Sequence, residues 1–116
     1  MKRSVNEFNH YRKRMNDKIL STDNLEIKRF FNLDSAVYKS GALDGKTKEL
    51  LGLVASMVLR CNDCIAYHLQ QCVNVGVNDA EFDEAFSVAL IVGGSIVIPH
   101  LRYAVEFKEQ VRDQDQ

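Results

Sequence analysis

The sequence predicts an all-α fold, a compact helical domain of about five to six helices that is oligomeric. Apolar residues recur at the helical spacings of three and four from one end of the chain to the other. No segment combines the strict apolar and polar alternation of a half-buried strand with turn signals on both sides. The 116 residues are 46% hydrophobic and 27% charged, a balance typical of one globular domain, so a single domain is expected over residues 1–116.

Two helical segments are predicted in the first 39 residues. Four apolar residues recur at steps of three and four in an otherwise charged segment and predict a helix over residues 5–19: Phe8, Tyr11, Met15 and Ile19. Residues 24–39 are predicted as one helix or two short ones, with Asn24 or Asp23 as the N-cap. The pairs Ser40-Gly41 and Asp44-Gly45 then indicate a turn.

Of the next two predicted helices, the first is expected to be the centre of the core. Residues 46–60 are apolar nearly all round, which is typical of a buried helix. A further helix is expected over residues 62–75, ended by Gly76, because glycine suits the left-handed position that follows a helix.

The last two helices are separated by a pair of glycines. Asn78 followed by Glu81 is a capping pattern for a helix that carries apolar residues at steps of four. Gly93-Gly94 breaks that helix. The final helix is expected to be capped by Ser95 or Ile98, with Pro99 in its first turn, and to end before the polar residues 113–116.

Charge and hydropathy make several classes of function poor fits. A net charge of -1 gives no broad basic field, so nucleic acid is not an expected partner. Residues 85–99 are uncharged but are interrupted by Gly93-Gly94, and they are too short to span ~30 Å of hydrocarbon. No membrane partner is therefore expected. The basic N-terminus is not followed by an apolar region typical of a signal peptide, so the expected location is cytoplasmic.

The most informative motif is a Cys-x-x-Cys pair followed by a histidine. On a helix, Cys61, Cys64 and His68 lie within roughly 60° of one another. Thiols three residues apart can close a disulfide across one turn, and an imidazole one turn beyond Cys64 can take its proton. Helix N-termini also favour thiolates, so the motif indicates redox chemistry.

Other uses of these residues remain open. Structural zinc usually takes four ligands, and His68, Cys72 and His100 are available, although a second Cys/His pair at finger-like spacing is missing. Ile65 follows the second cysteine, where haem attachment would require histidine. Cys72 would lie ~12 Å along a continuous helix from Cys64, so it is interpreted as a small buried apolar residue.

Glu49 is the fourth candidate site residue. Its predicted helix face is otherwise small or apolar: Gly52, Leu53 and Ser56. A carboxylate buried there requires a partner, and His68 on the following helix is suitable. The alternative interpretation is a solvated side chain beside Lys46 and Lys48.

Together these features resemble the carboxymuconolactone decarboxylase superfamily. The resemblance rests on Glu49, the Cys61-x-x-Cys64-x-x-x-His68 motif and the capped helix that follows Gly76, and it covers about residues 43–107. Within the superfamily, the paired cysteines resemble the alkylhydroperoxidase D-like branch. Residues before 43 match nothing that we can assign.

The resemblance implies an all-α homotrimer or homohexamer, with the dithiol at a helix start near subunit contacts. It further implies thiol-dependent peroxidase or disulfide-reductase chemistry with no metal or haem cofactor. Cys64 would be the sulfur that a hydroperoxide substrate oxidises, Cys61 the more exposed resolving thiol, and Glu49 with His68 the proton relay. An external dithiol would restore the pair, and a lipoyl, thioredoxin-like or peroxiredoxin-linked reductant is expected.

One departure and two alternative functions complete the prediction. Some relatives place a histidine between the cysteines, whereas this chain has Asn62-Asp63, and the Asp63 charge should disfavour a thiolate. A decarboxylase on the same fold is one alternative, although no cluster of basic residues suits a multiply charged acid. The other alternative is a helical oligomer whose dithiol senses redox state without turnover.

Overall fold

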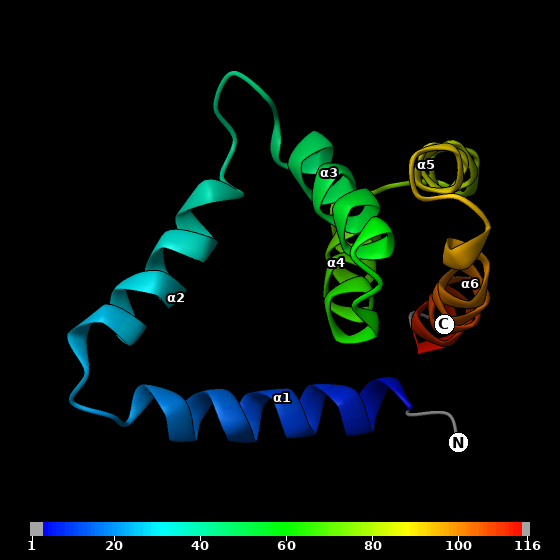
Figure 1. Ribbon diagram of the computed structural model, residues 1–116. Coiled ribbons are helices and arrows are strands. Elements are labelled where there is room, and N and C mark those ends of the chain that lie inside the picture. The colour runs from blue at the N-terminus through cyan, green and yellow to red at the C-terminus, as the bar shows by residue number, and fades with distance from the viewer. Residues whose placement is uncertain (1–3, 115–116) are drawn as a thin grey trace. The chain divides into compact units, whose positions relative to one another are not determined.

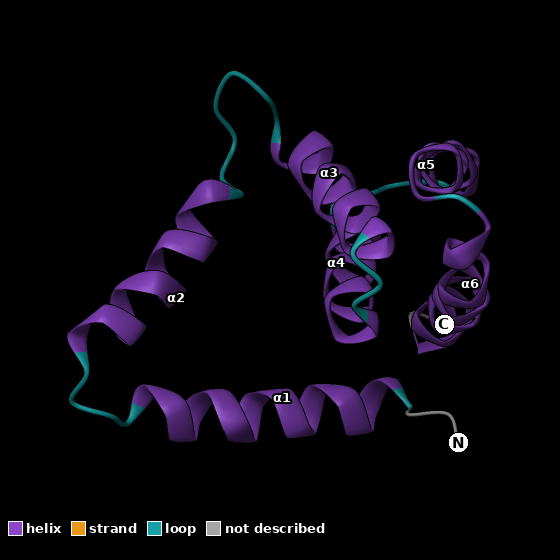
Figure 2. Cartoon of the chain, in the orientation of Figure 1, coloured by secondary structure: helices purple, strands orange, loops and turns teal. Residues whose placement is uncertain are grey.

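The computed structural model describes residues 4–114, which form six α-helices and one 3₁₀ turn (Figure 1). The elements are α1 (Val5–Leu20), α2 (Leu25–Val37), α3 (Gly45–Val58), α4 (Asn62–Asn74), α5 (Asp79–Gly93), the 3₁₀ turn η1 (Ser95–Val97) and α6 (Ile98–Gln114). Residues 4–114 contain no strand, as Figure 2 shows by colour. The predicted all-α fold is confirmed.

The chain divides into two compact units, residues 1–39 and residues 40–116. The first unit holds α1 and α2. The side chain of Ser4 caps α1 by accepting a hydrogen bond from Glu7 N, and Asn24 caps α2 by accepting one from Ile27 N. Residues 25–37 therefore form one continuous helix with Asn24 at its N-cap. The single-domain interpretation stays a prediction.

Helix α2 buries none of its residues. Its exposed large apolar side chains are Leu25, Ile27, Phe30, Leu33 and Val37. A 13-residue helix is marginal in water on its own, so packing is the usual source of its stability.

In the second unit, α3 contacts both α4 and α5, and α4 contacts α6. The buried apolar side chains of this second unit are Leu53, Met57, Ile65, Ala66, Leu69, Cys72, Val77, Phe82, Phe86, Ala89, Val97, Ala104, Phe107 and Val111. These residues come from every helix of the unit, so one core holds α3 to α6 together.

The expectation that residues 46–60 form a buried helix holds for only part of α3. Only one face of α3 is buried, and it carries Glu49, Leu53, Ser56 and Met57. Leu51 on the opposite side is 55% exposed. The reason is that α4 and α5 cover only part of the circumference of α3.

Two tight turns of the same type end α3 and α4. After α4, Gly76 adopts φ 87° while its N–H binds Val73 O and the N–H of Val77 binds Cys72 O. This is the Schellman pattern, and it confirms Gly76 as the end of the helix. After α3, the same hydrogen bonds form around Arg60, at φ 61°, and lead directly into Cys61. Arg60 therefore occupies a left-handed position usually taken by glycine.

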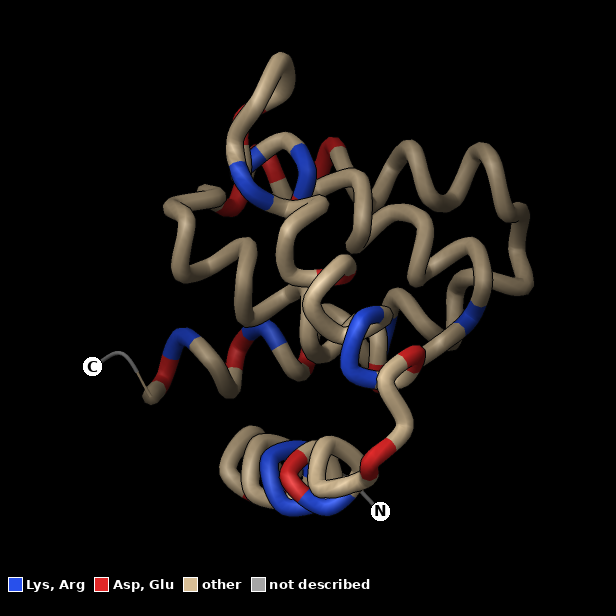
Figure 3. Tube along the Cα trace, turned by 90° about the vertical axis from the view of Figure 1, so that its left-hand side faces the viewer, with Lys and Arg blue, Asp and Glu red and all other residues tan. Residues whose placement is uncertain are grey.

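The second half of the chain follows the predicted order. Asn78 and Glu81 form the reciprocal capping box that starts α5. Gly94 adopts φ 81° after α5, and Pro99 falls in the first turn of α6. Helix α6 continues through residues 113 and 114, which were predicted to be tail. Figure 3 shows the uncharged stretch along the end of α5. No helix among residues 4–114 is long and apolar enough to cross a membrane.

One charge cluster fastens α5 to α6. Asp79 Oδ1 lies 3.4 Å from Lys108 Nζ and 3.1 Å from Arg112 Nη2. The positive charges of Lys108, which has the larger effect, and of Arg112 hold the pKa of Asp79 below its ordinary value. Arg112 also donates to Val77 O at 3.2 Å, so it ties the α4–α5 connection to α6.

Candidate active site

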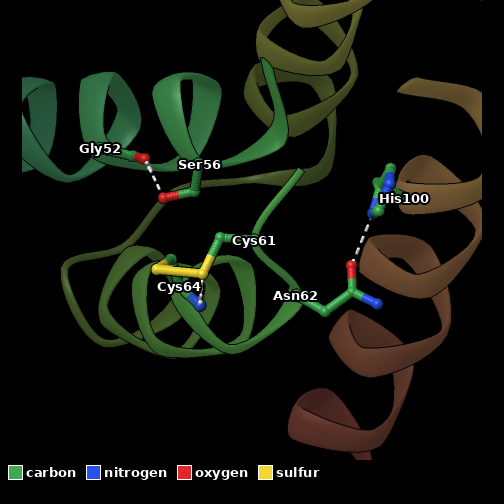
Figure 4. The surroundings of a disulfide bond; sticks show 6 residues. All are labelled: Gly52, Ser56, Cys61, Asn62, Cys64 and His100. Carbon is green, nitrogen blue, oxygen red and sulfur yellow. Dashed lines mark hydrogen bonds between the residues drawn. A yellow bond between two sulfur atoms is a disulfide. The ribbon is translucent and has the colours of Figure 1, made fainter. Parts of the chain in front are cut away.

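The dithiol motif lies at the start of α4, as predicted. Cys61 is the N-cap, and its Sγ accepts a hydrogen bond from Cys64 N at 3.2 Å. The two cysteines form a disulfide, with their Cα atoms 5.3 Å apart (Figure 4). Both cysteines lie at the start of α4, where the unpaired N–H groups of the helix favour a thiolate when the pair is reduced.

The relative exposure of the two cysteines differs from the expectation. Cys64 is exposed and Cys61 is half-buried, so Cys61 is not the more exposed of the two. The turn at Arg60 explains this, because the N–H of Cys61 binds Ser56 O and holds the residue against the end of α3. The assignment of the attacking and resolving sulfurs stays a prediction.

Glu49 and His68 meet between α3 and α4. Glu49 Oε1 lies 2.9 Å from His68 Nδ1, and the two residues are only 7% and 9% exposed. The interpretation of Glu49 as a solvated side chain is therefore wrong, because the carboxylate is buried with His68 as its partner. An ionised carboxylate only accepts hydrogen bonds, so Nδ1 of His68 is the donor in this pair.

The face of α3 toward α4 supplies the rest of the surroundings. Ser56 donates through Oγ to Gly52 O at 2.6 Å, and Figure 4 shows this pair on the α3 side of the disulfide. The ring of His68 also meets that of Tyr67 edge to face, with the centroids 5.0 Å apart. His68 lies one helical turn after Cys64 on α4, as the motif requires.

Cys72 forms no disulfide and is fully buried. Burial, followed by the negative charge of Glu49, raises the pKa of the Cys72 thiol to about 12. Cys72 therefore stays a protonated thiol at neutral pH, which agrees with its interpretation as a small apolar residue.

Sequence reasoning missed one contact at the dithiol. His100, considered only as a zinc ligand, approaches from α6 with Nδ1 2.8 Å from Asn62 Oδ1 (Figure 4). Asn62 stands between the two cysteines, yet 38 residues separate it from His100, and no local pattern links them. Across residues 4–114, no three His, Cys, Asp or Glu side chains gather as a metal site.

The fold and this site define a helical protein with a Cys-x-x-Cys pair at a helix start and a buried Glu–His pair between that helix and the preceding one. The carboxymuconolactone decarboxylase family model matches residues 27–107, and the chain belongs to that family. The match starts in α2, so the family resemblance begins earlier than the predicted residue 43.

Solved structures agree with this assignment. Two crystal structures of a Thermotoga maritima protein are 60% identical to this chain and cover 94% of it, with TM-scores of 0.89 and 0.91; the alignments cover 92% and 96% of those chains. That protein belongs to the same family, and a part in the antioxidative response has been suggested for it. A Legionella pneumophila family member in its apo form is 28% identical over 90% of this chain and 96% of its own, with a TM-score of 0.76.

A curated relative carries no activity in its name. It is uncharacterized protein 4 of the cox locus in Paracoccus denitrificans. The two chains are 27% identical over 82 residues, which cover 71% of this chain and 74% of the relative.

Proposed function

We propose that this protein is a thiol-dependent peroxidase that reduces hydroperoxides through the Cys61–Cys64 pair. The observation that carries the proposal is the combination of a bridged cysteine pair at the start of α4 with a buried Glu49–His68 pair from α3 and α4. The antioxidative role suggested for the Thermotoga maritima relative supports the same chemistry.

The cycle begins with proton removal from the reduced pair. Glu49 accepts the Nδ1–H hydrogen bond of His68, which leaves Nε2 to take the proton of the Cys64 thiol. The Cys64 thiolate then attacks one oxygen of the hydroperoxide, and the O–O bond breaks. The proton held on His68 goes to the departing oxygen, giving water or an alcohol and a sulfenic acid at Cys64.

The second half of the cycle restores the dithiol. The Cys61 thiol attacks the sulfenic sulfur of Cys64, the S–O bond breaks, and water leaves with the thiol proton. An external dithiol then supplies two electrons and two protons to reopen the disulfide. A lipoyl, thioredoxin-like or peroxiredoxin-linked partner fits this step, because each presents a dithiol to an exposed bridge.

The test is a single-turnover reaction of fully reduced protein with one equivalent of hydrogen peroxide, followed by thiol mass spectrometry. Wild type should lose two thiols to a Cys61–Cys64 bridge. Cys64→Ser should lose peroxide consumption, whereas Cys61→Ser should accumulate a trappable sulfenic acid at Cys64. Cys72→Ser is the matched control and should behave as wild type, because Cys72 is buried and protonated.

Two results would change the proposal. A sulfenic acid trapped at Cys61 in an active Cys64→Ser variant would reverse the roles of the two sulfurs. The protein would instead be a redox sensor, the non-enzymatic alternative on this fold, if stoichiometric peroxide oxidises it but excess dithiol supports no repeated turnover.

A further inference from the structure

The imidazole of His68 lies directly against the backbone of α3 at Gly52. A Cβ built on Gly52 would be 2.7 Å from Cε1, 2.8 Å from Nδ1 and 2.9 Å from Nε2 of that ring. All three separations are shorter than carbon can approach these atoms without displacement. Any residue other than glycine at position 52 therefore has to displace the ring or the helix.

Glycine at this position needs a reason, because it lies inside α3. A glycine in a helix interior destabilises the helix relative to alanine. Gly52 has no left-handed φ that would require glycine. The contact with His68 is the feature of the structure that only a missing side chain permits.

The same contact sets the position of His68 relative to Glu49. Glu49 lies one turn before Gly52 on the same helix, and its Oε1 is 2.9 Å from the Nδ1 atom that a Cβ on Gly52 would meet. The Ser56 hydroxyl holds the carbonyl of Gly52 at 2.6 Å and so fixes the backbone on which the ring lies. A ring pushed away from Gly52 leaves the Glu49 carboxylate buried without this hydrogen bond.

We propose that Gly52 is a positioning residue of the proton relay. Because Gly52 has no side chain, the imidazole of His68 can lie against the backbone of α3, and this contact fixes the ring beside Glu49. The proposal rests on the peroxidase function proposed above and deepens it. Gly52 contacts neither sulfur nor substrate in this scheme, and it acts through the orientation of His68.

The test compares Gly52→Ala with Gly41→Ala. A Cβ at Gly41 meets only Lys48 Nζ, at 3.8 Å, so this control adds a methyl group without displacing a neighbour. Gly52→Ala should slow the reaction of the reduced protein with peroxide by on the order of 10²-fold, the scale of a lost acid–base group. Gly41→Ala should keep the wild-type rate.

A double-variant comparison separates positioning from general damage. In a His68→Gln background, adding Gly52→Ala should change the rate little, because the group that Gly52 positions is already gone. Equal rate losses from Gly52→Ala in both backgrounds would overturn the proposal. If Gly52→Ala fails to fold, Gly52→Ala with His68→Ala should restore folding by removing the ring, and failure of both variants would also overturn it.

Nitrogen NMR of His68 gives a readout that does not depend on turnover. The wild-type ring should show a protonated Nδ1 and an unprotonated Nε2, and Gly52→Ala should lose this fixed tautomer. If Gly52→Ala keeps both the wild-type tautomer of His68 and the wild-type rate of reaction with peroxide, Gly52 does not position the ring. If His68→Gln reacts as fast as wild type, the proposed relay fails by itself, and the tautomer measurement then decides the role of Gly52 alone.

Discussion

Glu49 Oε1 and His68 Nδ1 lie 2.9 Å apart, although 19 residues separate them in the sequence. Both residues are buried, and they come from two helices that pack against each other. Removing one partner of a buried pair leaves the other without compensation, so the two should lose function together.

The first prediction follows from that pair. Glu49→Gln and His68→Gln should each slow peroxide reaction at Cys64 by on the order of 10²-fold to 10⁴-fold. The double variant should be little worse than the worse single variant, because both residues serve one proton path. Stopped-flow measurement of the thiol reaction checks this, and fully multiplicative losses would show that the residues act separately.

The second prediction concerns selectivity between the cysteines. The pKa of Cys72 is raised to about 12, so below that pH it stays a thiol and should resist iodoacetamide in the folded, reduced protein. Cys64, exposed in the first turn of α4, should be alkylated first. Peptide mapping after timed alkylation measures the order, with urea-unfolded protein as the control in which all three cysteines react. Early modification of Cys72 would contradict the burial of its thiol.

The third prediction is a gain in stability from Arg60→Gly. A left-handed φ costs a residue with a side chain roughly 1–2 kcal/mol, and glycine avoids most of that cost. The free energy of unfolding should rise by about 1 kcal/mol, partly offset by the greater flexibility of glycine in the unfolded chain. Denaturant unfolding checks this.

The reciprocal variant Gly76→Ala, at the equivalent turn after α4, should be less stable than wild type. A destabilised Arg60→Gly protein would mean that the arginine side chain stabilises the turn.

The fourth prediction is a pH dependence from Asp79. Lys108 and Arg112 lower its pKa, so the folded state binds this proton less readily than the unfolded state. The resulting stabilisation is complete above the ordinary pKa of an aspartate, near 3.8, and is lost as pH falls through the lower folded-state value. Asp79→Asn should therefore be less stable than wild type at pH 7, with the difference shrinking in acid. The control is Asp83→Asn, because Asp83 is exposed. If the difference in free energy of unfolding between Asp79→Asn and wild type stays constant with pH, the ion pairs of Asp79 are not its cause.

The fifth prediction concerns assembly. Several large apolar side chains of the second unit are exposed in the single chain, and Ile91 and Val92 on α5 are 84% and 66% exposed. Exposed apolar surface of this kind is typical of interfaces, so we expect a closed homo-oligomer, with a hexamer slightly ahead of a trimer. Light scattering should show a multiple of the 13.2 kDa chain, and Ile91→Lys should reduce it. A wild-type monomer at micromolar concentration would refute the prediction.

Most of what the sequence predicted correctly was local. The helix of residues 62–74, its Cys-x-x-Cys start and its end at Gly76 follow from spacing within about one turn. Glu49 could be paired with His68 because a carboxylate on an apolar helix face needs a partner. The hydrogen bond between Asn62 and His100 depends on how α6 meets the start of α4, which no local pattern records. The left-handed conformation of Arg60 was missed because arginine gives no signal for it.

Cys61 closes the disulfide and also caps α4, since its sulfur accepts the N–H of Cys64. The positive end of a helix interacts more favourably with a thiolate than with the neutral sulfur of a disulfide. Whatever stabilises the reduced form of such a pair raises its reduction potential and makes the disulfide a stronger oxidant. The position of the motif at the start of α4 thus favours the flow of electrons from an external dithiol into the bridge, which is the direction that regeneration of a peroxidase requires.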